Sequence, residues 1–305
     1  MTKEASFQIA FQGAPGAFSH RAGQLFAEHS GIRDEVKFVP CRSFDEVFNA
    51  ILSERCAVGV IPLENSSIGS IVANYDLLWK SPVSIIGEVY LPIHHHLLGF
   101  AGTQVKALTN VYSHPAALDQ CRNFLKSYPA MKPVAYWDTS GAALHVSASA
   151  NRKNAAIASE FAAKEANLAI LKRNVEDHEG NNTRFGIIAP VSAGSSNNGK
   201  VDERIDELVI AASKNYPLKL SCVVALPHTP GSLANLLKVF GDLGANLTKI
   251  ESRPIPEMRF HYRFFLDMEI SSREQEQAIL KACGEHTEEF KLLGRYCIWQ
   301  DDSDS

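Results

Sequence analysis

The chain has 305 residues, of which 45% are hydrophobic and 21% charged, and its formal net charge is −4 at pH 7. The length predicts two or three domains, and the acidic balance argues against a nucleic-acid partner. No run of about eighteen apolar residues is present to span a membrane, and the N-terminus has no apolar signal segment, so we expect a cytoplasmic protein with no membrane partner.

The N-terminal segment predicts a strand, a loop and a helix in that order. Residues 7–11 alternate as a strand, residues 12–20 form a glycine-rich loop, and residues 22–29 carry apolar side chains at helical spacing. The N–H groups at such a helix start attract anions, but the glycine spacing matches neither a dinucleotide fingerprint nor a P-loop. A helix capped by Ser43 and an apolar strand at 57–61 follow.

Polar side chains follow several predicted strands directly, where the next helix or loop begins. Together with Ser19 of the glycine-rich loop, these candidates are Glu64, Asn65, Ser66, Ser113, His114, Thr139 and Ser140. In open α/β sheets, ligands bind at the carboxyl ends of strands, so these residues are candidate ligand contacts. The alternative is purely structural: Asn65 or Ser66 caps a helix, and His114 caps or packs.

Strands and helices alternate as far as residue 190, which predicts an α/β region with a mostly parallel, doubly wound sheet. Because polar loops come from both halves of this region, we expect two lobes with a cleft between them. The triplet His94-His95-His96 does not predict a metal site, since alternate residues of a strand point to opposite faces and no partner has ligand spacing.

The loop at 178–182 leads into a short apolar strand at 185–189, and Thr183 and Arg184 directly precede this strand. The hydroxyl of Thr183, the guanidinium of Arg184 and the aromatic wall of Phe185 suit an anionic ligand that contains a ring. The alternative is a hydrogen-bonded turn that leads into a core strand.

Residues 192–216 are rich in Ser, Asn and Gly in their first part and predict a linker between a domain at 6–191 and a domain at 217–300. The second domain reads strand, helix, strand, strand, helix, strand, which is the βαββαβ order of ferredoxin-like folds. Thr229 is expected to cap its first helix, with Pro230 in the first helical position. The open sheet edge of such a unit commonly pairs with a second copy.

Eight stretches resemble, in order, those of prephenate dehydratases and the related arogenate dehydratases that carry a C-terminal ACT domain. The resemblance covers residues 7 to about 300 and is carried by residues 13–19, 62–66, 113–115, 138–143, 182–185, 229–233, 244–247 and 251–254. It implies a monofunctional enzyme without a chorismate mutase extension. It also implies a two-lobed catalytic region like the type-II periplasmic binding proteins, followed by a ferredoxin-like ACT domain.

The implied reaction is the decarboxylating dehydration of prephenate to phenylpyruvate, with arogenate as the alternative substrate. Thr183 is implied as the group that stabilises the leaving hydroxyl, and His114 and Glu64 are reserve proton donors. A tight ion pair to the carboxylate that leaves would stabilise the ground state, so we assign Arg184 to the side-chain carboxylate and Phe185 to the departing one. Hydroxyl and amide groups among the strand-end candidates would complete the site, and no metal or organic cofactor is required.

The resemblance also implies L-phenylalanine as an effector and a homodimer or a tetramer built as a dimer of dimers. The implied effector residues are Pro230, Gly231, Ser232, Leu233, Asn246, Leu247, Glu251, Ser252, Arg253 and Pro254. Glu251 and Arg253 are expected to connect this site to the catalytic lobes. A rival from another class is a non-catalytic amino-acid-sensing module, against which the intact triplet at 183–185 argues.

Overall fold

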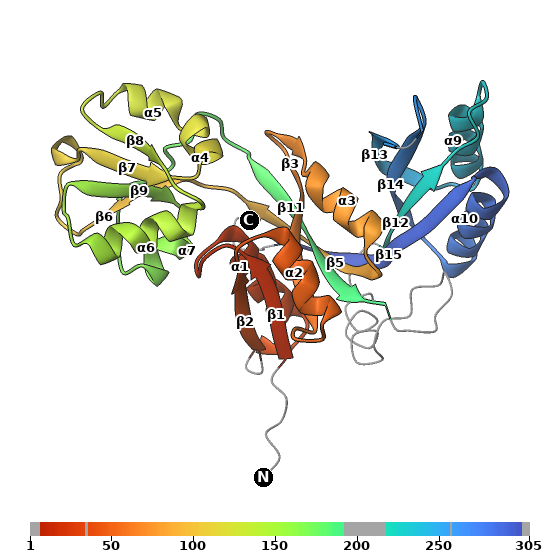
Figure 1. Cartoon of the computed structure of the whole chain (residues 1–305), viewed down its shortest axis with the longest axis horizontal. Helices are drawn as coiled ribbons and strands as arrows, with labels where there is room; N and C mark the ends of the chain where they lie inside the picture. Colours follow the sequence, from red (N-terminus) through yellow and green to blue (C-terminus); the bar gives the residue numbers. More distant parts are fainter. Residues whose placement is uncertain (1–6, 34–35, 192–217, 257, 301–305) are drawn as a thin grey trace, which may run out of the picture.

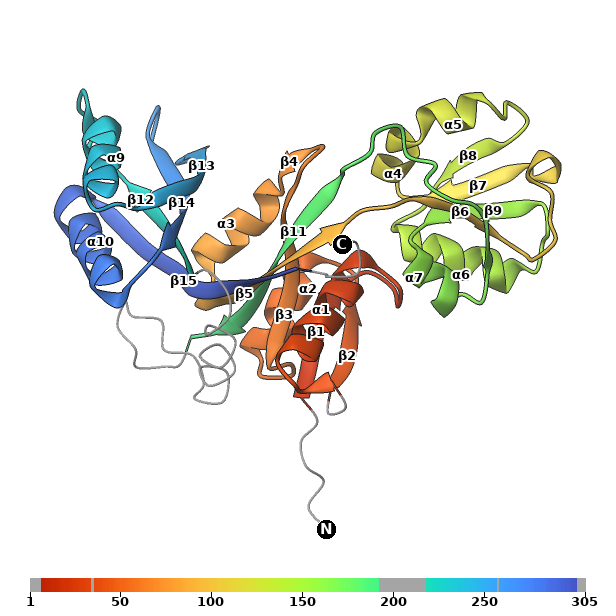
Figure 2. The ribbon, with the colours of Figure 1, turned by 180° about the vertical axis from the view of Figure 1, so that it is seen from behind.

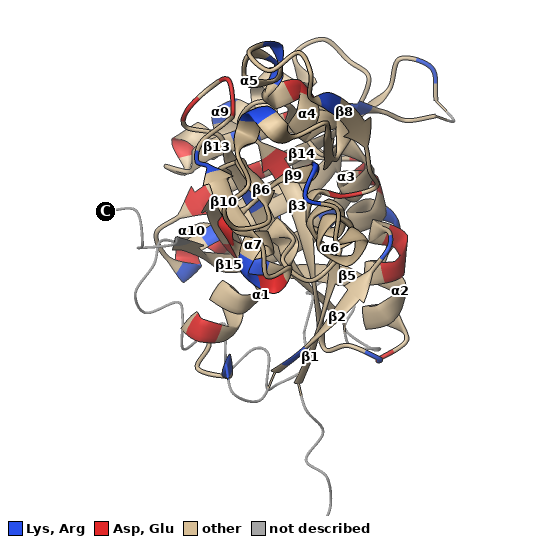
Figure 3. Cartoon of the chain, turned by 90° about the vertical axis from the view of Figure 1, so that its left-hand side faces the viewer, with Lys and Arg blue, Asp and Glu red and all other residues tan. Residues whose placement is uncertain are grey.

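The computed structural model describes residues 7–33, 36–191, 218–256 and 258–300, arranged as a central lobe, a second lobe and a C-terminal domain (Figure 1). The second lobe and the C-terminal domain lie at opposite ends of the molecule, with the central lobe between them. Within the described ranges, no helix combines the length and the apolarity needed to span a membrane. Acidic and basic residues are interspersed over the end of the molecule seen in Figure 3.

The central lobe is one half of a continuous sheet, with strand order β5-β11-β3-β1-β2. β1 is parallel to β2 and β3, whereas β11 is antiparallel to both β3 and β5. The sheet is therefore mixed, and the prediction of a mostly parallel sheet is wrong at β11. The strands are β1 (Phe7–Gln12), β2 (Val36–Cys41), β3 (Val58–Asn65), β4 (Gly69–Ser70), β5 (Val83–Pro92) and β11 (Asn182–Pro190), and the helices are α1 (Phe18–His29), α2 (Phe44–Leu52) and α3 (Val72–Lys80).

The second lobe has a five-stranded sheet in the order β10-β6-β9-β7-β8. Two segments connect it to the central lobe, one from β5 to β6 and one from β10 to β11 (Figure 1). Its strands are β6 (His96–Gly99), β7 (Asn110–Ser113), β8 (Lys132–Ala135), β9 (Asn154–Ala158) and β10 (Ala169–Lys172), and its helices are η2 (Val105–Ala107), α4 (Pro115–Gln120), α5 (Arg122–Lys126), α6 (Thr139–Ser149) and α7 (Glu160–Glu165).

The C-terminal domain has the predicted βαββαβ order, with strand order β13-β14-β12-β15. Its elements are β12 (Leu218–Ala225), α9 (Ser232–Asp242), β13 (Asn246–Pro254), β14 (Tyr262–Ile270), α10 (Arg273–His286) and β15 (Glu289–Gln300). The two-lobed α/β region followed by a ferredoxin-like domain is thereby confirmed. The predicted linker at 192–216 lies outside the described residues.

The first helix of this domain begins two residues later than predicted, at Ser232. Gly231 precedes it with a φ of 85°, in the left-handed region that glycine adopts readily. The hydroxyl of Thr229 bonds to the hydroxyl of Ser232 at 2.7 Å, so Thr229 does not cap the helix and Pro230 stands before it.

The last strand joins the C-terminal domain to the central lobe. β15 pairs antiparallel with β12, and its end pairs parallel with β5 from Cys297 opposite Gly87 onward. Figure 2 shows β15 passing from the C-terminal domain to the side of β5. Trp299, which is 1% exposed, packs in the central-lobe core, 5.4 Å from the Phe26 ring. The two domains therefore share one ten-stranded sheet.

The buried histidine of α1 predicts a loss of stability in mild acid. His20 stacks on Phe11 at 4.7 Å and accepts the Gly16 N–H at Nδ1, and burial lowers its pKa to about 4. Below about pH 6.5 the imidazole of His20 takes up a proton more readily in the unfolded chain than in the folded chain. We expect stability to fall by about 3 kcal/mol as the pH drops from 6.5 to 4, because one pKa unit corresponds to about 1.4 kcal/mol.

Urea denaturation of the native chain and of His20→Phe at pH 7.5, 6 and 5 measures this loss. The phenylalanine ring keeps the stacking and removes the titrating group. The variant should lose less stability than the native chain over the same interval. Equal losses in the two proteins would assign the acid sensitivity to other groups.

Candidate active site

A cavity of about 550 Å³ lies between the central and second lobes. Six of the candidate site residues line it: Ser19, Asn65, His114, Thr139, Thr183 and Phe185. They come from both lobes and from segments more than a hundred residues apart. The structure also places in its wall polar and aromatic residues that were not predicted: Gln12, Arg42, His95, Gln120, Trp137 and Asp138.

Thr183 stands at the start of β11 with its hydroxyl held by Asn65. The Asn65 amide nitrogen donates to Thr183 Oγ1 at 2.8 Å and to Asn181 Oδ1 at 2.7 Å. The Asn65 amide oxygen accepts the N–H groups of Ser67 and Ile68, which fixes the orientation of the amide. Thr183 Oγ1 is thus an acceptor toward Asn65. Among the described residues no acceptor takes its proton, which remains available to a ligand in the cavity.

Arg184 does not face this cavity, and its predicted contact with a substrate carboxylate is wrong. Successive side chains of a strand point to opposite faces, so Thr183 and Phe185 face the cavity while Arg184 faces the other side of the sheet. Its side chain is 6% exposed. Its guanidinium donates to Asp267 at 2.6 Å, Glu88 at 3.1 Å and the Tyr75 hydroxyl at 2.7 Å.

Four strand-end candidates also make structural contacts rather than line the cavity. Glu64 lies on the same side as Arg184, with its carboxylate 3.1 Å from Lys249 Nζ. Ser66 accepts the Asn182 N–H at 2.9 Å. Ser113 is buried and donates to the Ile157 carbonyl at 2.6 Å. Ser140 donates to the carbonyl of Pro15. Their prediction as substrate contacts does not fit these positions, because each polar group is already paired within the protein or points away.

The glycine-rich loop acts as a contact between the lobes. The Ala14 N–H donates to Asp138 Oδ2 at 2.8 Å, and Ser159 Oγ donates to the Gly16 carbonyl at 3.3 Å. Gly16 has a φ of 93°, and a Cβ there would lie 2.8 Å from the Ala162 Cα, so only glycine fits. The loop therefore fixes the cavity wall from which Ser19 and Gln12 face the ligand space.

The position of His114 is compatible with both interpretations from the sequence, a helix cap and a candidate ligand contact. It is the N-cap of α4, where its Nδ1 accepts the Ala116 N–H at 3.2 Å, and it also lines the cavity. His95 stands nearby, and burial lowers its pKa, so the imidazole is neutral at physiological pH. Its Nε2 lies 2.9 Å from Gln120 Oε1, which it meets as a donor.

Arg42 is the one arginine or lysine in the cavity wall within the described part of the chain. It precedes the capping residue of α2, and its backbone N–H donates to the Glu46 carboxylate at 2.7 Å. Its side chain is exposed, so it can turn to an anion at low cost. In the sequence it reads as an ordinary residue next to a helix start, and no local pattern marks it.

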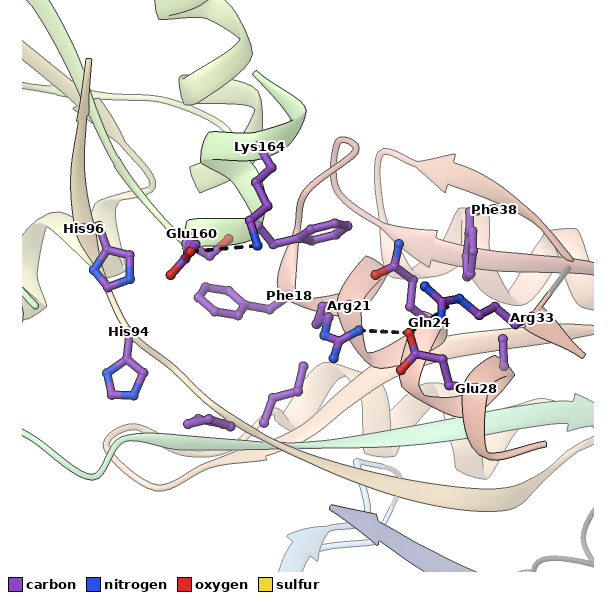
Figure 4. A pocket seen from close by; sticks show the side chains of 15 residues that line it. Phe18, Arg21, Gln24, Glu28, Arg33, Phe38, His94, His96, Glu160 and Lys164 are labelled. Atoms are coloured by element: carbon purple, nitrogen blue, oxygen red, sulfur yellow. Dashed lines mark hydrogen bonds and ion pairs between the residues drawn. The ribbon is translucent and has the colours of Figure 1, made fainter. Parts of the chain in front are cut away.

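A second cavity, of about 690 Å³, lies between α1 and α7 (Figure 4). The charged side chains around it pair with one another: Arg21 lies 3.3 Å from Glu28, and Lys164 lies 3.8 Å from Glu160. His94 and His96 of the histidine triplet line it, but none of the candidate substrate-contact residues does. The cavity that holds Thr183 is therefore the candidate active site.

The predicted effector residues separate into three groups. Pro230, Ser232 and Leu233 line a cavity of about 380 Å³ with side chains of β14, and Gly231 precedes α9 beside it. Glu251 accepts from Ser70 at 2.8 Å and Arg253 donates to Asp76 at 3.2 Å, so both contact the central lobe. The other four lie on β13 and do not line this cavity: Asn246, Leu247, Ser252 and Pro254.

Comparison with known proteins decides the family. The family model for prephenate dehydratase matches residues 9–193. A prephenate dehydratase of Methanocaldococcus jannaschii is 35% identical over 286 residues, which cover 93% of this chain and 96% of that protein. The chain belongs to the prephenate dehydratase family. It is accordingly a carbon–oxygen lyase of aromatic amino-acid biosynthesis.

Two further similarities extend the family context. Arogenate dehydratase 2 of Petunia hybrida is 35% identical over 317 residues, covering 97% of this chain and 73% of that protein. The structure of prephenate dehydratase from Arthrobacter aurescens in complex with L-Phe matches with a TM-score of 0.76 at 24% identity, over 95% of this chain and 89% of that one. The latter similarity shows a shared fold across the lobes and the C-terminal domain.

Proposed function

We propose that the chain converts prephenate to phenylpyruvate and that L-phenylalanine, bound to the C-terminal domain, regulates the reaction. The observation that carries this proposal is the Thr183 hydroxyl, which accepts from Asn65 and keeps its proton for a ligand in the cavity. In the reaction the bond from the ring to its carboxylate breaks, CO₂ leaves, and the electron pair completes the aromatic ring. The ring hydroxyl departs and takes up a proton to form water.

Thr183 supports the second half of this step. As the bond from ring carbon to oxygen breaks, negative charge develops on the leaving oxygen, and a fixed donor stabilises it more in the transition state than in the ground state. The Asn65 amide, which donates into Thr183 Oγ1, holds the hydroxyl in this orientation. Thr183 contributes a hydrogen bond, and the proton itself comes from solvent or from His114, which lines the same cavity.

The two substrate carboxylates need different surroundings. We assign the side-chain carboxylate to Arg42, which pairs with carboxylates well through its planar fork. The ring carboxylate loses its charge as CO₂, so an apolar wall favours its departure. Phe185 and Ile93 supply such a wall on the cavity side of β11 and after β5.

The effector proposal rests on the cavity between the start of α9 and β14, which Pro230, Ser232 and Leu233 line. A homodimer or a dimer of dimers is proposed because β13 is the edge strand of the shared sheet and exposes Ile250.

The test is turnover of prephenate and of arogenate by the purified chain, each with and without L-phenylalanine. Light scattering of the same samples gives the assembly state. Phenylpyruvate formed from prephenate and suppressed by phenylalanine supports the proposal. Turnover of arogenate alone would keep the mechanism and change the substrate. No turnover of either, with phenylalanine still bound, would favour the sensing module.

A further inference from the structure

A buried cluster of four charged side chains joins the strand of Thr183 to the C-terminal domain. It consists of Arg184 on β11, Glu88 on β5, Lys219 on β12 and Asp267 on β14, and each side chain is at most 6% exposed. Arg184 lies 2.6 Å from Asp267 and 3.1 Å from Glu88, and Lys219 lies 2.7 Å from Glu88. These four buried side chains are two cations and two anions, and the partly exposed Glu64 carboxylate lies 3.6 Å from Arg184 at the edge of the cluster.

This cluster fixes geometry more than it adds stability. Removing charged groups from water costs several kcal/mol per ion, and an apolar cluster of similar volume commonly gives equal or higher stability. A charge left without its partner in such a site is strongly unfavourable, so each member must follow its partner when either strand moves. Arg184 is consequently bound to the position of Asp267.

Arg184 transmits that position to the active site because it is the residue next to Thr183. The two side chains leave opposite faces of β11, one into the cluster and one into the cavity. The pairing of β11 with β3 is irregular next to these residues, because Arg184 lies opposite Glu64 and Phe185 lies opposite Pro62. A displacement of the guanidinium therefore changes the direction of the Thr183 hydroxyl.

Asp267 is in turn connected to the cavity of the C-terminal domain. β14 carries Tyr262 and Phe264 in the wall of that cavity and Asp267 three residues further along, directed toward the central lobe. The Asp267 carboxylate also accepts from Ser221 at 2.6 Å, and its backbone carbonyl accepts from Thr248 of β13. A ligand that shifts β14 thus acts on Asp267 directly.

We propose that Asp267 is a positioning residue: through its ion pair with Arg184 it sets the orientation of Thr183 and carries the effect of a ligand in the C-terminal cavity to the active site. This inference rests on the proposed function and names the contact by which regulation reaches the catalytic hydroxyl. The same contact acts in the unliganded protein, where it holds the active geometry.

The variant Asp267→Asn tests the proposal because it keeps the shape and one acceptor and removes the charge. We expect kcat to fall about tenfold with KM changed less than about twofold, since the substrate contacts remain. Phenylalanine should bind, as measured by calorimetry, but inhibit at least about tenfold less effectively. The control is Glu276→Gln, which removes an ion pair with Arg295 inside the C-terminal domain and should behave like the native chain.

A second variant and a second readout keep the test decisive. Asp267→Asn combined with Arg184→Gln leaves no uncompensated charge between these two residues and is the alternative where the single variant does not fold. Amide exchange of residues 181–187, measured with and without phenylalanine, reports the strand itself and does not depend on turnover. We expect phenylalanine to change this exchange in the native chain and in Glu276→Gln, and not in the Asp267 variants.

The two proposals fail in different ways. A native chain that turns over neither substrate overturns the proposed function, and the exchange experiment still decides the role of Asp267. Native kcat and native inhibition in Asp267→Asn, or a phenylalanine effect on residues 181–187 that persists in both variants, would overturn the role of Asp267 while the function stands.

Discussion

Replacement of Thr183 by alanine lowers kcat for prephenate by about 100- to 1,000-fold, the usual cost of removing one fixed donor from a developing negative charge. Because the Thr183 hydroxyl contributes little to substrate binding in the ground state, KM should change little. Thr183 is 7% exposed, and the loss of its γ atoms leaves Asn65 held by Asn181 and by two backbone N–H groups. Steady-state kinetics and thermal denaturation of the same samples separate catalysis from folding.

Two matched variants test the reason for the loss. Thr183→Ser keeps the hydroxyl and should retain most of the turnover. Asn65→Asp places a carboxylate where the amide donates, so that Thr183 gives its proton to residue 65 in place of the substrate. We expect Asn65→Asp to lose about as much activity as Thr183→Ala, by the same argument about donors. Near-native turnover in Thr183→Ala would remove this hydroxyl from the mechanism.

The order of the elements and the place of Thr183 follow from the sequence because both depend on local patterns. The alternation of strands and helices predicts the two-lobed region and the βαββαβ domain. Polar residues after apolar strands predict Asn65, His114 and Thr139 in the cavity wall. The direction of the Arg184 side chain also follows from the sequence, because three consecutive residues of a strand cannot all face one cavity.

Other features depend on contacts between distant segments and leave no local trace. Arg42 reaches the cavity because the end of β2 meets the loop after β1, where the Gly13 N–H donates to the Cys41 carbonyl. The serines at positions 113 and 140 have the same sequence context as the candidates that line the cavity, and only the packing of the lobes turns them toward protein carbonyls. A single sequence does not distinguish these cases.

The pairing of β15 with β5 could likewise not be predicted from the local sequence pattern. This pairing is the basis of the second large expected effect. Replacement of Trp299 by alanine should lower the stability of the folded chain by about 3–5 kcal/mol, the usual range for a fully buried tryptophan. The indole fills space that Gly87 leaves open, where a Cβ would come within 2.0 Å of the ring. Its loss leaves a void between β5 and α1 that the surrounding core fills only in part.

The measurement is urea denaturation followed by circular dichroism, with Trp137→Ala as the control. Trp137 undergoes the same truncation but is 49% exposed, so its replacement should change stability by less than about 1 kcal/mol. Because Trp299 anchors the end of the strand that continues into the C-terminal domain, the variant should also show a separate, earlier unfolding transition of that domain. A stability equal to that of Trp137→Ala would mean that β15 does not hold the two domains in one sheet, and the route from Asp267 to Thr183 would then lack its rigid frame.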